Sequence, residues 1–243
     1  MEFAERPSFD HRDRQDIYEY VERHGRVTPT EVREALDFDE RRFGHQVAIL
    51  RRDGIVEEVE GELQIAIDDG AEEEYVDEEV AFTIRPARQA DLTGLVGVIR
   101  SVVEDGSYVL AESVADLVDH EEVLLRHNEL ESRMFFVATV DDAVVGWVHL
   151  RAPEQQKLSH TAELTLGVLR EYRGHGIGSH LHERGLEWAA SNGYERIYNS
   201  VPATNEAAVA FLEGHGWELE AVREDHYRID GESVDEVMLA RTL

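Results

Sequence analysis

The sequence predicts an α/β fold in which a large domain follows a small helical one. From residue 81 onward, short stretches that alternate apolar and polar residues are separated by amphipathic stretches with helical spacing. A glycine-rich turn, Gly174 to Gly178, joins one such strand to one such helix. Residues 11–67 carry instead three helical patterns followed by a hairpin pattern. We therefore expect a domain at 1–67, a linker at 68–80 and a second domain at 81–243.

The composition excludes several classes of protein. No run of about 18 apolar residues occurs, so no membrane-spanning helix is expected. The N-terminus, Met1 to Arg6, lacks the apolar segment of a secretory signal. The chain has no cysteine, which excludes disulfides, thiolate metal sites and a cysteine acyl-enzyme. These features favour a cytoplasmic protein.

The charge of the chain is strongly negative, with 53 acidic residues against 24 lysines and arginines and a formal net charge of −29. Lys157 is the single lysine. The acidic residues are spread along the whole chain, which favours a solvated surface adapted to high salt over a site for a cationic partner. In molar salt, charges are screened within ~3 Å, so the charge by itself identifies no ligand. We expect a halophilic source.

Residues 11–67 are expected to form three helices and a hairpin. A first helix spans Asp13 to His24, and a capping box, Thr28-Pro29-Thr30-Glu31, begins a second that ends at Leu36. A third helix runs from about Asp39 to Arg52. Two stretches then alternate apolar and polar residues around Glu60-Gly61, which is typical of a hairpin; they are Ile55 to Val59 and Leu63 to Ile67.

Three helices followed by a two-stranded wing resemble a winged helix-turn-helix domain. The resemblance implies that the third helix enters a DNA major groove, with Arg41, His45 and Arg52 on its groove-facing side. The same pattern also fits a module for protein–protein contact or dimerisation, because residues 11–67 show no broad basic surface. DNA and protein therefore both stay open as partners of this domain.

Beyond it, the segment Asp68 to Val80 is expected to be a solvated linker, because eight of its thirteen residues are acidic. The following domain is expected to have the element order βα(α)βββαβαββ. We expect its strands at Phe82–Arg85, Met134–Val140, Val144–Arg151, Ala162–Val168, Arg196–Ser200, Trp217–Val222 and Glu236–Ala240. We expect its helices at Asp91–Val103, Ser113–Leu130, Ile177–Asn192 and Asn205–His215.

The glycine-rich turn is the most informative part of this domain. Its glycines have no Cβ atom, so backbone N–H groups can approach a ligand closely. The helix that follows adds unpaired N–H groups and the positive end of its dipole, which together favour a phosphate. A P-loop would need Gly-Lys-Ser/Thr and a dinucleotide fingerprint would need G-x-G-x-x-G. The turn has G-x-G-x-G and matches neither.

Together with the strand that ends at Val168, the turn Arg173-Gly174-His175-Gly176-Ile177-Gly178 resembles the pyrophosphate loop of the GNAT superfamily of acyl-CoA-dependent N-acyltransferases. The element order is similar to the GNAT fold, a mixed sheet flanked by helices. The resemblance implies acetyl-CoA as acyl donor and no metal. It places the pantetheine arm on backbone groups of Leu166 and Val168. It places the pyrophosphate on Arg173, Gly174, His175, Gly176, Ile177, Gly178 and Ser179.

A second feature of the family is the pattern N-x-x-A-x-x-F, which here begins at Asn205 and reaches Phe211. The resemblance implies that Asn205 hydrogen-bonds the pantetheine arm, and a helix N-cap is an alternative or additional role for it. Where the family often has a tyrosine that protonates the leaving thiolate, this sequence has Leu212. Another donor, such as a water molecule or Tyr227, would then serve, or the thiolate leaves unassisted.

The reaction implied by the resemblance is direct attack of a primary amine on the acetyl thioester in a ternary complex. An alkylamine has a pKa of about 10.4, so a base must remove a proton. Glu163 and His149 are the candidates, with Tyr227 as a candidate acid. A backbone N–H near Val168 would stabilise the oxyanion. The histidines suggest no metal site, because His180 and His182 point about 200° apart on a helix.

The acceptor is expected to be a small amine, an amino acid or a protein N-terminus, because the closing segment Tyr227 to Met238 resembles the last hairpin of enzymes acting on these. A different class of function is a DNA-binding transcription regulator whose GNAT-like domain senses acyl-CoA without turnover. Leu212 and the Arg41, His45 and Arg52 face favour that alternative. The sequence also leaves a homodimer open.

Overall fold

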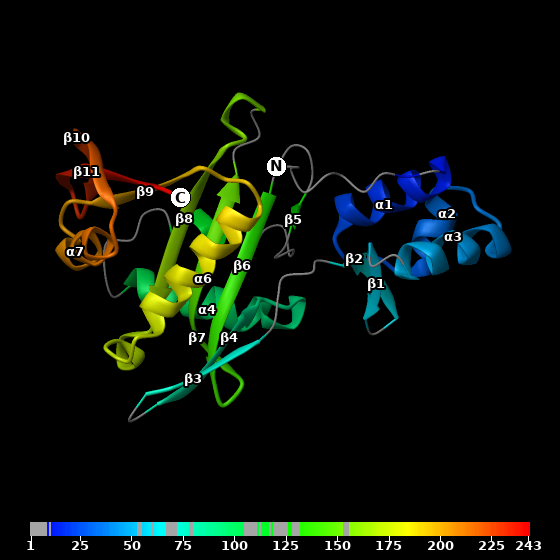
Figure 1. Cartoon of the computed structure of the whole chain (residues 1–243), viewed down its shortest axis with the longest axis horizontal. Coiled ribbons are helices and arrows are strands. Elements are labelled where there is room, and N and C mark those ends of the chain that lie inside the picture. The colour runs from blue at the N-terminus through cyan, green and yellow to red at the C-terminus, as the bar shows by residue number, and fades with distance from the viewer. Residues whose placement is uncertain are drawn as a thin grey trace. The chain divides into compact units, whose positions relative to one another are not determined.

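A computed structural model gives the structure of the chain. It describes residues 9, 11–52, 55–59, 61–66, 72–77, 80–104, 111, 113–116, 118, 126–127, 132–152 and 156–243. The chain divides into two compact units, one built mainly from the chain up to Asp69 and the other mainly from Gly70 onward (Figure 1). Within the described residues, no helix has the length and apolar character needed to cross a membrane.

The N-terminal unit contains three helices and a hairpin, as predicted. Its elements are α1 (Arg12–His24), α2 (Pro29–Ala35), α3 (Glu40–Arg52), β1 (Val56–Val59) and β2 (Glu62–Ile65). The capping box at the start of α2 is confirmed, with Glu31 N 3.2 Å from Thr28 Oγ1 and Thr28 N 2.8 Å from Glu31 Oε2. Apolar side chains from all five elements form one core: Ile17, Val21, Val32, Phe43, Leu50, Val56 and Leu63.

An ion pair joins α1 to α3 at the edge of this core. Arg42 donates through Nε and Nη2 to the two carboxylate oxygens of Asp13, at 2.5 and 2.6 Å. Asp13 is buried, whereas Arg42 remains half-exposed. The hydrogen bonds from Arg42 lower the pKa of Asp13. The pair therefore fixes the distance between two helices that also share apolar contacts.

The second unit is built on a mixed sheet. Its strands are β3 (Glu73–Val76), β4 (Ala81–Pro86), β6 (Ser132–Val140), β7 (Ala143–Ala152), β8 (Thr161–Val168), β9 (Arg196–Pro202), β10 (Glu218–Ile229) and β11 (Glu232–Thr242). They lie in the order β10-β11-β9-β8-β7-β6-β4-β3. Neighbouring strands of this series are antiparallel except β8 and β9, which are parallel. A further two-residue strand, β5, spans Arg126–His127.

Two helices cover opposite faces of the sheet, α4 (Leu92–Glu104) and α6 (Ile177–Ser191) (Figure 1). Because side chains alternate along a strand, Phe135 packs in the core beneath α4 and Phe136 in the core beneath α6. Trp147 belongs to the α4 side and Leu164 to the α6 side. A third helix, α7 (Glu206–Gly214), lies between β9 and β10 in sequence. Short 3-10 turns occupy Gln89–Asp91, Gln156–Leu158 and Arg170–Tyr172.

The strand β3 corrects the prediction for the acidic segment, which was expected to be a solvated linker. Residues 73–76 instead pair antiparallel with β4, with Tyr75 opposite Phe82. The Tyr75 and Phe82 rings stack with centroids 5.3 Å apart. The strand was not predicted because Tyr75 is the only apolar residue on its inward face and its neighbours are acidic. The predicted helix Ser113–Leu130 lies mostly outside the described residues. Residues 113–116 and 118 are helical, but residues 126–127 form strand β5, so the helix prediction is wrong there.

Candidate active site

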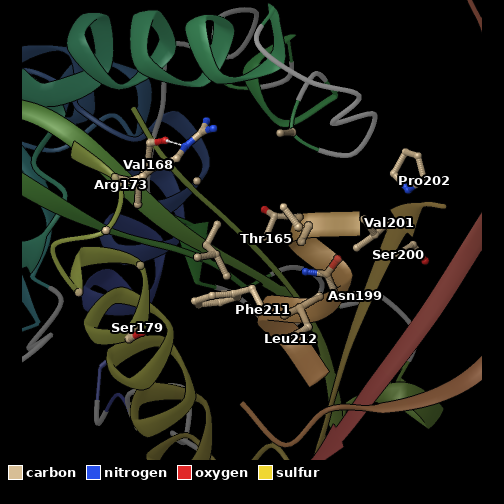
Figure 2. Close-up of a pocket in the computed structure, with 18 residues that line it drawn as sticks. Thr165, Val168, Arg173, Ser179, Asn199, Ser200, Val201, Pro202, Phe211 and Leu212 are labelled. Carbon is tan, nitrogen blue, oxygen red and sulfur yellow. Dashed lines mark hydrogen bonds between the residues drawn. The ribbon is translucent and has the colours of Figure 1, made fainter. Parts of the chain in front are cut away.

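The two parallel strands β8 and β9 separate and open a cavity. They pair only from Thr161 opposite Arg196 to Glu163 opposite Tyr198. Beyond that point a cavity of about 520 Å³ lies between β8, β9, the start of α6 and α7 (Figure 2). Its lining residues are Ala111, Thr165, Leu166, Gly167, Val168, Arg173, Gly174, Gly176, Gly178, Ser179, Asn199, Ser200, Val201, Pro202, Ala207, Ala208, Phe211 and Leu212.

A buried amide holds the fork between the strands. Asn199 of β9 donates through Nδ2 to the backbone oxygen of Leu164 on β8 at 2.6 Å. The side chain therefore replaces a ladder hydrogen bond just where the strands part. Asn199 was not among the predicted site residues. Its signal was a polar side chain between Ile197 and Val201, which are both buried in an otherwise apolar strand face.

The backbone of β8 directs N–H and C=O groups toward the cavity. Leu169 N donates to Val145 O of β7 at 2.9 Å, whereas Leu164 O accepts from Asn199 on the β9 side. Successive residues of a strand direct their N–H and C=O groups to opposite sides. Leu166 and Val168, which are even-numbered like Leu164, therefore direct theirs toward the side from which β9 has withdrawn. These are the two residues predicted to serve the pantetheine arm.

The glycine-rich turn closes one end of the cavity. Gly174 and Gly176 have φ angles of +91° and +80°, which L-residues with a side chain rarely adopt. The first hydrogen bond at the start of α6 runs from His180 N to Gly176 O at 3.1 Å. The N–H groups of Ile177, Gly178 and Ser179 precede it, so they have no intrahelical acceptor. Such N–H groups at a helix start suit an anion.

Two other residues that were predicted to hold the pyrophosphate, Arg173 and Gly178, line the cavity. Arg173 lines the cavity and donates through Nε to Val168 O at 2.9 Å, which ties the turn back to the end of β8 (Figure 2). A methyl group added at Gly178 would meet only ordinary contacts, 3.7 Å from Phe211 and 3.8 Å from Val168. A side chain at this position would therefore occupy cavity space without a clash with the backbone.

The start of α6 is joined to α7 through His215. Its Nδ1 lies 2.7 Å from Phe211 O and its Nε2 lies 3.1 Å from Ser179 Oγ. A carbonyl accepts only, so Nδ1 carries the proton and Nε2 accepts from the Ser179 hydroxyl. This chain of hydrogen bonds connects the anion end of the cavity to its apolar wall. His215 was not among the predicted site residues.

Asn205 serves as the N-cap of α7, because its side chain accepts from Ala208 N at 3.2 Å. Its Nδ2 is buried and has no hydrogen-bond partner among the described residues. The cavity lining itself begins two residues later, at Ala207. Leu212 is buried and lines the cavity, so the position where the family often has a tyrosine presents an apolar side chain.

The candidate base His149 lies in the sheet interior. Its ring stacks on Phe135 with centroids 4.4 Å apart, and Nδ1 lies 3.3 Å from Oγ1 of Thr165, which lines the cavity. Burial, followed by the charges of Arg133 and Arg151, lowers the pKa of His149 to about 3. An imidazole with that pKa holds a proton poorly at neutral pH. The structure therefore disfavours His149 as general base.

The candidate base Glu163 lies at the last paired position before the fork. Its side chain is half-exposed and accepts from Arg151 Nη2 through Oε2 at 2.8 Å. Glu163 does not line the cavity, but Thr165, which follows it on the same face of β8, does. Water has access to the carboxylate, so a proton could reach Glu163 through a solvent molecule.

The candidate acid Tyr227 lies in a cluster around a buried carboxylate. Its hydroxyl donates to Glu236 Oε1 at 2.8 Å, and Arg223 Nη1 contacts Glu236 Oε2 at 2.9 Å. Burial and the bond to Glu236 raise the pKa of Tyr227. Tyr227 does not line the cavity, although Glu236 is the β11 partner of Pro202, which does. Glu236 was not among the predicted site residues.

The remaining predicted residues are not among those that line this cavity. Arg41, His45 and Arg52 are all exposed on α3 of the N-terminal unit. His180 stacks on Tyr75, and His182 accepts a hydrogen bond from Trp217 Nε1 at 2.8 Å. Across the residues that the structure describes, no three histidine or carboxylate side chains converge closely enough to hold a metal ion.

Comparison with known proteins gives a consistent result. The sequence profile described as the acetyltransferase (GNAT) family matches residues 98–217. N-alpha-acetyltransferase 50 of Danio rerio is 30% identical over 93 residues, which cover 38% of this chain and 55% of that protein. The putative phosphinothricin acetyltransferase YwnH of Bacillus subtilis (strain 168) is 24% identical over 167 residues, which cover 67% of this chain and 99% of that protein.

Solved structures support the fold. The structure of yncA, a putative acetyltransferase from Salmonella typhimurium with its cofactor acetyl-CoA, has a TM-score of 0.56 at 16% identity. The match covers 67% of this chain and 94% of that one. The chain spans little more than half the length of the Danio rerio relative, at 55%. The chain therefore contains a GNAT-family acetyltransferase domain, formed by the part that holds the mixed sheet.

Proposed function

We propose that the chain transfers the acetyl group of acetyl-CoA to a primary amine. The observation that carries this proposal is the cavity at the β8–β9 fork. One wall of this cavity is the edge of β8 beyond its pairing with β9, and a helix start lies at one end. The strand edge suits an amide-rich arm, and the helix start suits a pyrophosphate. The solved relative from Salmonella typhimurium was determined with acetyl-CoA.

The residues of the chain would hold acetyl-CoA through backbone groups. In this proposal, Leu166 hydrogen-bonds the pantetheine arm and the N–H groups between Gly174 and Ser179 hold the pyrophosphate. Asn205 has a buried Nδ2 that is free to donate, although it lies beside the lining residues rather than among them. Acetyl-CoA supplies the activated thioester, and the protein supplies orientation and charge stabilisation.

The reaction follows from these positions. The neutral amine attacks the thioester carbonyl, a C–N bond forms and the C–S bond breaks. The N–H of Val168, which faces the cavity, stabilises the negative charge that develops on the carbonyl oxygen. Glu163 accepts the amine proton through water. Leu212 offers no hydroxyl and Tyr227 is bonded to Glu236, so the thiolate takes its proton from water.

The acceptor in this proposal is a small amine, an amino acid or a protein N-terminus. The two curated relatives described above differ in this respect, since one is named an N-alpha-acetyltransferase and the other a putative phosphinothricin acetyltransferase. Turnover is measured as amine-dependent thiol release across these three classes in molar KCl. A thiol reagent reports CoA alone, because the chain has no cysteine.

The role of Glu163 is tested by Glu163→Gln, which we expect to lower kcat about 100-fold by loss of general-base catalysis. Glu220→Gln is the matched control, because Glu220 is also an exposed strand glutamate paired with an arginine, Arg196, at 3.1 Å. Equal kcat values for the two variants would remove Glu163 from the mechanism. Acetyl-CoA binding without thiol release for any acceptor would favour an acyl-CoA sensor instead.

We propose that the N-terminal unit is a winged-helix-like domain. Its three helices and hairpin support this, and α3 exposes Arg41, His45 and Arg52. The hairpin carries Glu57, Glu58 and Glu62, which would repel a DNA backbone. DNA binding therefore stays a prediction, tested by electrophoretic mobility of random duplex DNA with wild type and an Arg41→Ala, Arg52→Ala double variant.

We also propose that the chain is adapted to high salt.

A further inference from the structure

Strand β3 and the residue that follows it, Asp77, contact α6 and the glycine-rich turn through every second side chain. Asp77 Oδ2 lies 3.0 Å from His175 Nδ1. Tyr75 stacks on His180 with ring centroids 3.9 Å apart. Glu73 Oε1 lies 3.4 Å from Arg184 Nε. The three contacts are thus made by Glu73, Tyr75 and Asp77, all from a segment that precedes the residues matched by the family profile.

The spacing of these contacts shows that strand and helix run beside each other. Two residues of a strand advance about 6.7 Å, and four residues of a helix advance about 6 Å. The step from Tyr75 to Glu73 therefore matches the step from His180 to Arg184. Because the spacings agree, Tyr75 and Glu73 reach their partners at matching intervals along α6. The contact of Asp77 with His175 extends this ladder of contacts to the glycine-rich turn.

The end of this ladder lies inside the predicted phosphate loop. His175 is flanked by Gly174 and Gly176, which both have positive φ angles. Two such glycines give the loop backbone many alternative conformations. Because His175 lies between them, its contact with Asp77 limits these conformations. The Asp77 carboxylate accepts only, so the His175 Nδ1 atom donates. His175 is mostly buried there, at 19% exposure of its side chain.

We propose that Asp77 is a positioning residue for acyl-CoA, with Tyr75 in support. By holding His175, Asp77 keeps the N–H groups from Gly174 to Ser179 directed toward the pyrophosphate. The inference rests on the proposed function, because it assigns the anion at this loop to acyl-CoA. It adds to that function a strand outside the family-matched region that takes part in donor binding.

The negative charge of Asp77 allows a decisive test, because charge repulsion and loop positioning predict opposite effects of its removal on acetyl-CoA binding. A carboxylate beside an anion site repels the anion, so its removal by itself would tighten acetyl-CoA binding. If Asp77 positions the loop, its removal weakens binding instead. Asp77→Asn separates the two effects, because the amide oxygen still accepts from His175 while the charge is gone.

The experiment measures acetyl-CoA binding by calorimetry on the full chain in molar KCl. We expect Asp77→Ala to raise the Kd about 3- to 10-fold, the range of one lost hydrogen bond, and to raise the KM for acetyl-CoA with little change in kcat. Asp77→Asn is expected to bind at least as tightly as wild type. The matched control is Glu74→Ala, which removes an exposed acid from the same strand, on the opposite face. It should leave the Kd within about 2-fold or tighten it.

Tighter binding by Asp77→Ala, or equal weakening by Glu74→Ala, would overturn the proposal. A second readout separates it from the proposed function. Amide hydrogen exchange of the first hydrogen-bonded amides of α6, from His180 to Glu183, should be faster in Asp77→Ala than in Asp77→Asn without any ligand. Faster exchange together with no acetyl-CoA binding by wild type would show that Asp77 anchors the loop through His175. It would overturn the proposed function and, with it, the role of Asp77 in acyl-CoA binding. Unchanged exchange with intact wild-type binding would overturn the anchor alone.

Discussion

At the scale of single residues, the wall of the cavity depends on an aromatic ring that lies over a glycine. Trp147 and Gly167 are opposite each other on β7 and β8. A Cβ atom at Gly167 would overlap the six-membered ring of Trp147. The ring of Trp147 is fully buried, and its indole N–H has no hydrogen-bond partner among the described residues. Because Gly167 has no side chain, Trp147 of the α4-side core can pack directly against the backbone of the cavity wall.

We predict that Gly167→Ala destabilises the fold by about 1–3 kcal/mol, the usual cost of overpacking. Trp147 would have to move, because its position is incompatible with the added methyl group. Gly97→Ala is the control, since Gly97 lies in α4 with nothing near its missing Cβ; it should stabilise by up to ~1 kcal/mol. Urea denaturation measures both. A neutral Gly167→Ala would show that the ring packs elsewhere.

Protonation of His149 makes the stability of the fold depend on pH. Its folded pKa is about 3, below its ordinary value of 6.5. Between these values the unfolded chain binds a proton at this residue and the folded chain does not, so the stability it contributes above pH 6.5 is lost as the pH falls toward 3. The slope is at most about 1.4 kcal/mol per pH unit.

We therefore predict that His149→Phe, which keeps a ring against Phe135, loses less stability than wild type between about pH 6.5 and pH 4. The measurement is the free energy of unfolding as a function of pH. His160→Phe, at an exposed position, is the control and should leave the slope unchanged. Parallel profiles for wild type and His149→Phe would mean that His149 titrates normally in the folded protein.

At the scale of elements, the helices and strands that could be predicted are those whose own residues show a full pattern of apolar and polar positions. The helices Arg12–His24 and Ile177–Ser191 lie within one residue of their predicted bounds. Strand β3 was missed because its inward pattern is carried by Tyr75 among acids that pair with partners far along the chain. The site divides in the same way. The glycine loop is local and was predicted, whereas Asn199 and His215 act through partners that only the tertiary structure brings near.

The attachment of α1 to α3 is an element-scale property with a simple test. We predict that Arg42→Ala lowers the urea midpoint of the N-terminal unit, because Asp13 would lose both hydrogen bonds while it stays buried. Arg41→Ala is the matched control, since Arg41 is the exposed neighbour on the same helix and should change the midpoint little. Equal effects of the two substitutions would show that the ion pair contributes nothing to stability.

At the scale of the whole molecule, the net charge of −29 is the dominant feature. Like charges repel and destabilise a compact state, and salt shortens the screening length from about 10 Å at 0.1 M to about 3 Å at 1 M. We predict that the melting temperature rises steadily from about 0.1 to 2 M KCl. A melting temperature that is constant or falls over this range would contradict the proposed adaptation to high salt.

The central claim is that the fork between β8 and β9 binds acyl-CoA, and calorimetry tests it most directly. Wild type, Gly176→Glu and Gly193→Glu are titrated with acetyl-CoA in molar KCl. The two glycines have nearly equal φ angles, +80° and +82°, but Gly193 lies beyond the opposite end of α6 in open space. The account predicts binding by wild type and Gly193→Glu and its loss in Gly176→Glu. No binding by wild type, or equal binding by all three, would contradict it.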